Sequence, residues 1–324
     1  MKVSIIIVCM NNMKNIYPCL NSIKKYTSID YEVLLVAYKF SEENMRKLIT
    51  DFPWITIIES QEIRGFSENN NLALKQAKGD FCFVLNDDTY FETPVVDMLY
   101  NTMIEHSDID ILSPNLYYPD GRMQFLGRPK LNARKFILTT LKIWGEKNMR
   151  NVYHEKKGIY DIYNISGAAF MIKTDVFKTL GWFDENYFFS PEDIALSTLA
   201  KQKGYRICQN SDIHITHIAS ATSSPISAAT LPASFKGHLM FYSNYNKLKF
   251  YLLCIIESPL IITKCCVYKI LSWITHSETH KIYANAEFNT LVSIWNNETP
   301  KEIFTKFYTK IVTKKDDEST LCKR

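Results

Sequence analysis

Two acidic residues and an amide follow an apolar run in the first third of the chain. Asn86, Asp87 and Asp88 come directly after residues 81–85, whose composition is that of a buried strand. Oxygen ligands at the end of a strand suit a hard divalent cation such as Mg²⁺ or Mn²⁺, whose coordination a nucleotide diphosphate would complete. The same residue types also form Asx turns or begin a helix, here over residues 89–93. The triplet alone leaves both interpretations open.

A second pair of carboxylates, Glu192 and Asp193, follows an aromatic run at residues 187–189 and Pro191. Proline favours the first position of a helix, so both carboxylates are expected in the first helical turn. They could act there as acid or base toward a ligand. Acidic residues also favour this turn because the helix dipole and the free amides attract negative charge. Spacing alone leaves these alternatives open as well.

The first hundred residues alternate between short β-branched runs and helical patterns, which is typical of parallel βαβ units. The expected strands cover residues 2–9, 32–37, 55–58 and 81–85. The expected helices cover residues 16–25, 42–50 and 67–78, the last with Ser67 as its N-cap. Because such sheets bind ligands beyond the carboxyl ends of their strands, residues 10–12, 38–41 and 86–88 are functional candidates.

Periodic patterns are weaker in the rest of the chain. Residues 114–158 are expected to be mostly loops. They are followed by an expected strand at 168–173, helices at 175–180 and 191–203, and short strands at 206–208 and 212–216. Residues 223–234, rich in Ser, Ala and Pro, are expected to be a linker. This linker would join an α/β domain at residues 1–222 to a helical, basic region at residues 235–324.

The composition is that of a globular protein, with 46% hydrophobic residues and a formal net charge of only +4. Neither value favours nucleic acid as a partner. The eight cysteines lack the paired spacing of a disulfide framework or a zinc site, so buried, reduced thiols in a cytosolic protein are expected. The N-terminus has the pattern of a strand and not of a signal peptide. Glu257, Pro259, Lys264 and Lys269 interrupt the apolar residues 248–274, so no transmembrane helix is expected.

Several short motifs occur in a fixed order along residues 1–222. They are VSIIIV (3–8), GFSENNN (65–71), AKGD (77–80), LNDDT (85–89), SGAAF (166–170), GWFDE (181–185) and the pair Glu192-Asp193. In order and separation this series resembles glycosyltransferase family 2, and in particular its bacterial rhamnosyl- and galactosyltransferase-like members. The resemblance implies a GT-A fold, in which helices flank a Rossmann-like, mostly parallel sheet. It also implies an inverting, single-displacement transfer from a nucleotide-activated sugar.

The same resemblance gives roles to individual residues. Asp88 matches the last acid of the family's metal-binding motif and would hold Mn²⁺ or Mg²⁺ together with His217. Asp193 matches the catalytic base, which takes a proton from the acceptor hydroxyl. The implied donor-binding positions are Cys9, Asn11, Arg64, Asn70, Asn86 and Asp87, and the implied acceptor-side positions are Trp182, Asp184 and Glu192.

The sequence departs from the family pattern at several positions. Ala37 and Tyr38 stand where an Asp usually contacts the nucleotide, and Ala195 and Leu199 replace an Asp and an Arg after the acidic pair. Arg64, in place of a common Asn, either reaches a phosphate or lies on the surface. These departures leave open a non-catalytic protein that binds sugar nucleotides or glycans, but the metal-binding and catalytic residues given above all remain. No glycine-rich phosphate loop near the N-terminus supports nucleotidyl transfer.

The C-terminal region is basic, with thirteen Lys and Arg against eight Asp and Glu from residue 234 onward. Basic residues beside aromatic and aliphatic ones suit a helix that lies on anionic lipid, or a face that packs on the catalytic domain or on a second copy of the chain. We therefore expect a cytoplasmic enzyme that is peripheral on the inner face of the cell membrane or forms a homodimer. Its partners would be a nucleotide-sugar donor and a glycan or lipid-linked acceptor in surface polysaccharide biosynthesis.

Overall fold

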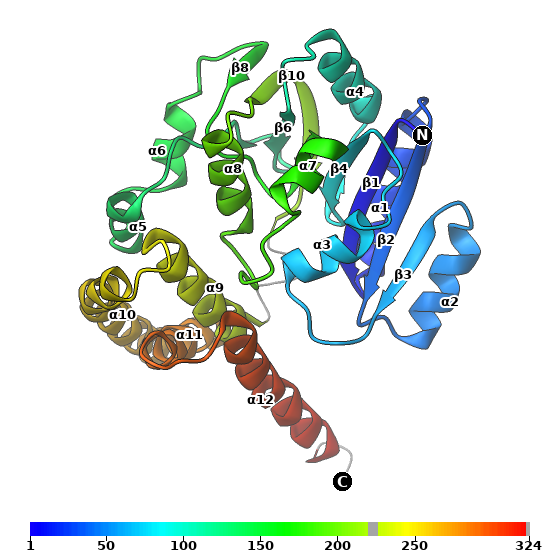
Figure 1. Cartoon of the computed structure of the whole chain (residues 1–324). Coiled ribbons are helices and arrows are strands. Elements are labelled where there is room, and N and C mark those ends of the chain that lie inside the picture. The colour runs from blue at the N-terminus through cyan, green and yellow to red at the C-terminus, as the bar shows by residue number, and fades with distance from the viewer. Residues whose placement is uncertain (220–225, 322–324) are drawn as a thin grey trace.

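The computed structural model describes residues 1–219 and 226–321 of the chain. An α/β unit with a central sheet forms one part of the molecule, and the C-terminal helices gather beside it (Figure 1). The last helix, drawn in red, extends away from the rest of the chain. This arrangement has the α/β fold class that the sequence predicts.

The sheet has ten strands within the described residues, and eight of them form one path in the order β3-β2-β1-β4-β9-β6-β10-β5. The bounds are β1 (Val3–Met10), β2 (Tyr31–Tyr38), β3 (Thr56–Ser60), β4 (Phe81–Asn86), β5 (Thr89–Tyr90), β6 (Ile111–Tyr117), β7 (Met123–Phe125), β8 (Ile159–Asp161), β9 (Ala169–Lys173) and β10 (Ile207–His217). On this path only β9 and β5 run against the direction of the other strands. The prediction of a mostly parallel sheet is confirmed.

Helices cover both faces of the sheet. One hydrophobic core involves α1 (Met13–Tyr26), α2 (Glu42–Asp51) and α4 (Val95–Glu105), and the other involves α3 (Phe66–Leu74), α7 (Thr174–Leu180) and α8 (Glu192–Gln202). In β1, Ile5 and Ile7 join the first core and Ile6 joins the second, and all three are fully buried. Burial of each such side chain contributes about 1.5–3 kcal/mol. A strand that is apolar at successive positions therefore belongs at the centre of a sheet with helices on both faces.

The register of the central strands aligns their carboxyl ends. Met10 of β1 pairs with Tyr38 of β2, and Val8 of β1 pairs with Asn86 of β4. The loops that follow β1, β2 and β4 therefore leave the sheet along one edge. This is the edge at which the sequence places the functional candidates.

Helix α3 differs from its predicted form at both ends. Its N-cap is Gly65 and not Ser67, and the Gly65 N–H donates to the Glu68 carboxylate at 3.0 Å. A Cβ on residue 65 would lie only 2.4 Å from the carbonyl oxygen of Phe188, so the close approach of that segment selects glycine. The helix ends at Leu74 instead of continuing to residue 78, because the N–H groups of residues 78 and 79 already donate to Ser4 Oγ. Tertiary contacts thus set both ends.

Residues 114–158 contain more regular structure than predicted. Strands β7 and β8 flank two short helices, α5 (Ala133–Thr140) and α6 (Glu146–Asn151). Asn132 caps α5, since its side-chain oxygen accepts a hydrogen bond from the Lys135 N–H at 2.9 Å. Phe136 of α5 packs against Phe235 in the C-terminal region, with 5.2 Å between ring centroids. A helix of two turns that is held by distant side chains leaves little periodic pattern in its own sequence.

Strand β10 replaces the two short strands predicted at residues 206–208 and 212–216. It runs without a break from Ile207 to His217, and its pairing with β6 shifts register between Asn210 and His214. At this irregularity the Asn210 side chain accepts a hydrogen bond from the Asp212 N–H at 3.0 Å. The extra length of the bulged strand carries His217 to the edge of the sheet where β4 ends.

In the described part of the chain, four helices follow the sheet. They are α9 (Ser227–Tyr242), α10 (Lys247–Thr275), α11 (Glu278–Ile294) and α12 (Pro300–Leu321). The helical C-terminal region is confirmed, but the predicted linker at residues 223–234 is wrong from Ser227 onward, and residues 220–225 lie outside the described part. Ala229 and Ala233 are fully buried within α9. Their small side chains therefore serve close helix packing, not flexibility.

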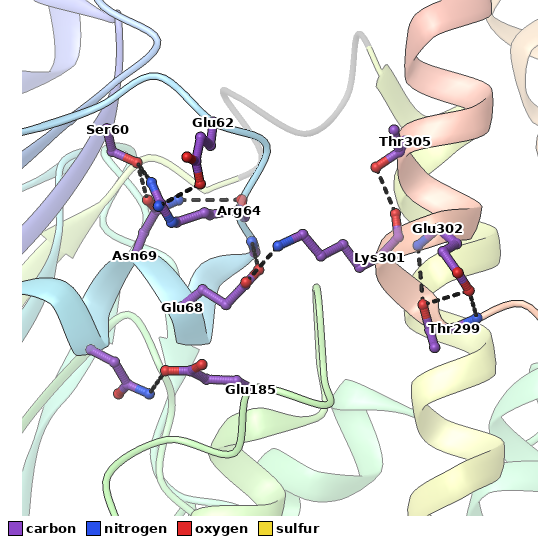
Figure 2. A network of polar contacts seen from close by, with 12 residues as sticks. Ser60, Glu62, Arg64, Glu68, Asn69, Glu185, Thr299, Lys301, Glu302 and Thr305 are labelled. Carbon is purple, nitrogen blue, oxygen red and sulfur yellow. Dashed lines mark hydrogen bonds and ion pairs between the residues drawn. The ribbon is translucent and has the colours of Figure 1, made fainter.

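The C-terminal helices pack directly on the α/β unit. Phe304 of α12 lies against Phe188, with 4.4 Å between ring centroids. Lys301 Nζ lies 2.6 Å from the carboxylate of Glu68, which also caps Gly65 at the start of α3 (Figure 2). The sequence left open whether this region contacts lipid, packs on the first domain or packs on a second copy of the chain. For α12, the structure shows packing on the first domain.

Two of the charges that interrupt the apolar residues of α10, Glu257 and Lys264, are held by the protein interior or by an ion pair, whereas Lys269 is exposed. Glu257 is fully buried, and burial raises its pKa to about 7. Lys264 Nζ lies 2.5 Å from the carboxylate of buried Glu287 on α11. Residues 257 and 264 therefore do not break the apolar outward face of α10, although the sequence suggested that they would. By length and composition α10 alone among the described helices could cross a membrane, a test that buried helices of soluble proteins also pass.

Candidate active site

A cavity of about 360 Å³ lies at the carboxyl edge of the central strands. Asp88, which follows β4, and Asp193, in the first turn of α8, both line it. His217 at the end of β10 and Arg64 before α3 also line it. The acids that the sequence places far apart in the chain therefore converge on one cavity, as predicted.

Asp88 and His217 form one side of this cavity. The short antiparallel pairing of β5 with β10 places His217 opposite Thr89, and the Ile218 N–H donates to the carbonyl of Asp88 at 3.0 Å. His217 Nε2 lies 3.2 Å from Asp88 Oδ1. Backbone pairing thus fixes the distance between the two side chains.

The tautomer of His217 follows from its other neighbour. His217 Nδ1 lies 2.7 Å from the side-chain oxygen of Gln124 on β7, and an amide oxygen can only accept a hydrogen bond. In the neutral imidazole, a proton on Nδ1 leaves the lone pair of Nε2 facing the carboxylate of Asp88. Two electron-rich atoms at that distance are stabilised by a cation held between or beside them. Gln124 therefore orients His217 as an outer partner orients a metal-bound histidine.

The donor set fits a hard divalent cation that keeps several positions open. Asp88 supplies a carboxylate oxygen and His217 an imidazole nitrogen, while the Asn86 side chain lies 3.5 Å from His217 Nε2. Within residues 1–219 and 226–321, no group of three or more His, Cys, Asp or Glu side chains has metal-binding geometry. Mg²⁺ and Mn²⁺ commonly take only one or two protein ligands and complete their coordination with water and phosphate oxygens.

Asp87 has a different environment from Asp88, although it also lines the cavity. Burial raises the pKa of Asp87 to about 7, against the lowering effect of the Cys9 thiol beside it. One Asp87 oxygen is buried without a hydrogen-bond partner among the described residues. Cys9 itself is fully buried, and its pKa is raised by burial. Cys9 therefore contacts Asp87 through a hydrogen bond of its thiol and does not itself line the cavity.

The other predicted donor-binding residues divide into two groups. Asn70 and Arg64 line the cavity. Arg64 donates to Ser60 Oγ at 3.1 Å and pairs with Glu62 at 2.6 Å, as Figure 2 shows. Asn11 does not line the cavity, because its side-chain oxygen accepts from the Ser41 N–H at 3.2 Å and so joins two loops.

Asp193 is held by three donors on the other side of the cavity. Its Oδ2 lies 2.8 Å from Arg128 Nη1 and 3.2 Å from the Gly167 N–H, and its Oδ1 accepts from the Ile194 N–H at 2.8 Å. The start of α8 adds the favourable field of a helix N-terminus. A carboxylate with three fixed donors keeps one orientation toward whatever occupies the cavity.

The neighbouring Glu192 differs from Asp193. Its side chain is buried and accepts a short hydrogen bond from the Ser190 N–H. Burial, and then the charge of Asp193, raise the pKa of Glu192 well above its ordinary value. Glu192 therefore favours its neutral form beside a carboxylate that is paired with Arg128. The two adjacent acids have separate environments, which often marks separate roles.

Trp182 and Asp184 are not brought to this cavity. They line a different pocket, which Leu199 also lines and which contains neither Asp88 nor Asp193. Trp182 packs against Phe177, with 5.4 Å between ring centroids, and Asp184 accepts a hydrogen bond from the Asn186 N–H at 3.0 Å. Although both residues are close to Asp193 in the sequence, they do not line the cavity that contains it. The structure therefore does not support the acceptor-side role that the resemblance implies for them.

Sequence reasoning missed Arg128 and Gln124. Both lie in the stretch predicted as loops, and neither belongs to a motif. Arg128 reaches Asp193 because the Arg128 N–H donates to the Asn164 carbonyl at 3.1 Å. This bond ties its segment to the loop between β8 and β9 that also carries Gly167. The only available signal was their residue type, a lone arginine and a lone glutamine, which is too weak to select them.

Comparison with known proteins agrees with this geometry. A family model for glycosyl transferase family 2 matches residues 4–181. The O-antigen biosynthesis protein RfbC of Myxococcus xanthus is 22% identical over 59% of this chain and 15% of its own length. The uncharacterized glycosyltransferase YwdF of Bacillus subtilis strain 168 is 31% identical over 35% of this chain and 44% of its own length. The chain thus spans less than half the length of each of these relatives.

Solved structures share the fold at low identity. GalNAc-T7 with UDP, GalNAc and Mn²⁺ has a TM-score of 0.54 at 15% identity and covers 67% of this chain and 44% of its own. The mannosyltransferase PcManGT from Pyrobaculum calidifontis, in complex with GDP-Man and Mn²⁺, has a TM-score of 0.53 at 13% identity. Its match covers 92% of this chain and 88% of its own. The predicted GT-A fold is confirmed. Because the family model covers more than half of its length, the chain belongs to glycosyl transferase family 2.

Proposed function

We propose that this glycosyltransferase moves a sugar from a nucleotide-sugar donor to a hydroxyl group of a glycan or lipid-linked acceptor, with inversion at the anomeric carbon and with the help of a divalent cation. The observation that carries the proposal is the convergence of Asp88, His217 and Asp193 on one cavity. Two features support the substrate class. The relative RfbC is named for O-antigen biosynthesis, and the structural neighbours hold UDP or GDP-Man.

Asp88 and His217, with Asn86 beside them, would hold the cation. A bound Mn²⁺ or Mg²⁺ supplies Lewis-acid stabilisation of the negative charge on a departing diphosphate. The chain prepares that site by setting the His217 tautomer through Gln124 and by fixing Asp88 through the β5–β10 pairing. Arg64, which lines the same cavity and is paired with Glu62, would offer its guanidinium N–H groups to a phosphate.

Asp193 is the proposed general base. An acceptor hydroxyl is a weak nucleophile, and a carboxylate within about 2.6–3.2 Å of it can take its proton as the oxygen attacks. Arg128 and the Gly167 N–H both contact Oδ2 of Asp193, which leaves this carboxylate in a fixed pose. With the base and the departing diphosphate on opposite sides of the sugar, the anomeric centre inverts.

Nucleotide-sugar turnover tests this proposal directly. Purified chain incubated with a panel of UDP-, GDP- and dTDP-sugars and Mn²⁺ is expected to release nucleoside diphosphate when glycan acceptors are present. Chelation of the cation with EDTA should abolish the release, and added Mn²⁺ should restore it. Binding of a donor without release across donors and acceptors would instead support a non-catalytic sugar-nucleotide-binding protein.

We further propose that the outer face of α10 lies on an anionic lipid surface. Large apolar side chains recur on this face at spacings of three, four, seven and eight residues, which keep them on one side of a helix. They are Leu248, Leu252, Ile255, Ile262, Ile270 and Trp273, all at least 46% exposed. Apolar faces of this extent mark interaction surfaces. A cytoplasmic enzyme would use it to reach a lipid-linked acceptor on the inner face of the membrane.

Charge favours lipid over a second copy of the chain. Lys247, Lys249 and Lys269 are exposed on α10, and its only acid, Glu257, is buried. A symmetric dimer through this face would bring lysines toward lysines, because both copies present the same patch. Each lysine near an anionic bilayer instead contributes about 1 kcal/mol of attraction.

Vesicle flotation checks this surface. The wild-type chain is expected to float with vesicles that contain anionic phospholipid, whereas Ile255→Glu/Ile262→Glu should remain in the aqueous fraction because two charges would enter the apolar layer. Ile49→Glu is the matched control, since Ile49 is 54% exposed on α2. Failure of the wild type to float, together with a dimer that the double substitution dissociates, would contradict lipid binding and place a second copy on this face.

A further inference from the structure

A separate cavity of about 420 Å³ meets the first one at Asp193. Glu192 and Asp193 line both cavities. The second cavity is bounded by α5, by the start of α8 and by α9 and α10, so it lies between the sheet unit and the C-terminal helices. A molecule in it and a donor in the first cavity would approach the Asp193 carboxylate from two sides.

One wall of the second cavity is aromatic. Phe136 of α5 stacks on His238 of α9 at 5.4 Å between centroids with 2° between ring planes, and on Tyr242 at 5.0 Å with 26°. His238 Nδ1 lies 2.9 Å from the Ser234 carbonyl, and burial lowers the pKa of His238, so it contributes ring surface and not charge. A pyranose ring has one face lined by C–H groups, which packs well on the electron-rich face of an aromatic ring. Pockets that combine such walls with a few polar groups are typical of small-molecule sites.

Among the described residues that line this cavity, Lys135 is a basic side chain without a carboxylate partner. Of the other basic side chains, Arg128 is paired with Asp193 and Lys264 with Glu287. Lys135 donates to the Lys130 carbonyl at 2.7 Å and lies 5.2 Å from the Trp144 ring centroid, and no carboxylate in the described residues pairs with it. A lysine ammonium has three donors, so it can bind an anion as well.

The chain around Lys135 is strongly basic. Residues 128–150 contain seven Lys and Arg against one acid, Glu146, which gives a net charge of about +6. This positive charge favours an anionic ligand over a neutral one at the rim of the cavity, because opposite charge attracts and retains a bound group. Of the two acids that line the cavity, Asp193 is already balanced by Arg128, and burial raises the pKa of Glu192 so that its neutral form is favoured.

We propose that this second cavity is the acceptor subsite and that it takes a sugar carrying a phosphate, with the ring on the Phe136 wall and the phosphate on Lys135. The inference rests on the proposed transfer reaction. An acceptor hydroxyl gives its proton to Asp193 while its oxygen forms the bond to the donor's anomeric carbon. The bond from that carbon to the diphosphate breaks, and its electron pair leaves with the nucleoside diphosphate.

Ligand binding tests the subsite without any need for turnover. Saturation-transfer NMR in EDTA compares a panel of hexose 1-phosphates with the matching methyl hexosides and with inorganic phosphate. At least one hexose 1-phosphate is expected to bind about tenfold more tightly than its methyl hexoside, and inorganic phosphate alone should not displace it. Lys135→Met should remove this preference, and Phe136→Ala should weaken both sugar forms.

Two matched substitutions locate the site. Lys142→Met removes an exposed lysine of the same segment that does not line the cavity, and Arg64→Met removes the arginine of the first cavity. Both should leave the preference intact. An unchanged preference in Lys135→Met, or its loss in Arg64→Met, would overturn the assignment. A short polyprenyl diphosphate sugar run beside the sugar 1-phosphates shows whether the lipid-linked or the free form binds more tightly.

The ligand-binding test of the subsite and the test of the transfer reaction can fail independently of each other. If no donor is ever turned over but hexose 1-phosphates bind through Lys135, the transfer reaction fails and the anion subsite stands. If donors are turned over but Lys135→Met leaves phosphorylated and neutral sugars bound alike, the subsite fails and the reaction stands.

Discussion

Asp193→Asn is expected to lower the rate of sugar transfer by roughly 10²–10⁴-fold, the range that a general base contributes. Asparagine keeps the shape of the side chain but cannot accept the proton of the acceptor hydroxyl. Nucleotide-sugar affinity should change little, because the predicted donor and cation contacts lie on the Asp88 side of the cavity. Calorimetric donor binding, measured beside transfer kinetics, separates the two effects.

The control for this substitution is Asp184→Asn, which changes the same residue type in a different pocket. It should retain transfer. Because Asp193→Asn leaves Arg128 without its partner, thermal unfolding of both variants shows whether a loss of activity reflects misfolding. A folded Asp193→Asn that transfers sugar at the wild-type rate would remove Asp193 from the role of base.

His217→Ala and Asp88→Asn are expected to abolish the gain in donor affinity that Mn²⁺ provides. Loss of a residue that only orients a metal ligand costs about 10–100-fold in metal affinity, and loss of a ligand itself should cost at least as much. In EDTA, the variants and the wild type should bind a nucleotide sugar with similar, weak affinity. Titration of donor with and without Mn²⁺ measures this difference.

His214→Ala provides the matched control, because His214 lies three residues before His217 on the same strand and hydrogen-bonds the Ser211 carbonyl at 2.7 Å. It should keep the full Mn²⁺ effect. If His217→Ala also kept it, the cation would have to bind elsewhere in the cavity.

The sequence predicted the parts of the fold that local patterns determine. Apolar runs predicted β1 and β4 as strands of a parallel sheet, and the motif series that resembles the family gave Asp88 and Asp193 their roles in one site. Burial on both faces of a parallel strand leaves a continuous apolar run, which is why these elements were visible. The rule that ligands bind beyond the carboxyl ends of parallel strands predicted the place of Asp88. The expectation that Asp193 converges with it came from the resemblance to the family.

The remaining parts depend on contacts that no local pattern contains. Gly65 replaced Ser67 as the N-cap because Phe188 approaches residue 65 from across the chain. Helix α5 forms where its aromatic face meets α9, and it brings Phe136 to the proposed acceptor subsite. Trp182 lies in a motif next to the site in sequence but turns toward another pocket. Sequence proximity and residue type are therefore weaker guides to the acceptor side than to the donor side.

The central claim is that one cavity holds the cation and the donor on the Asp88 side and presents the anomeric carbon to residue 193. A crystal structure of Asp193→Asn with Mn²⁺ and an intact nucleotide sugar tests it, with the metal located by its anomalous scattering. We expect one manganese peak within bonding distance of both Asp88 and His217, and the anomeric carbon facing the substituted side chain. A peak away from these two metal-binding side chains, or a sugar whose anomeric carbon points away from residue 193, would contradict the mechanism.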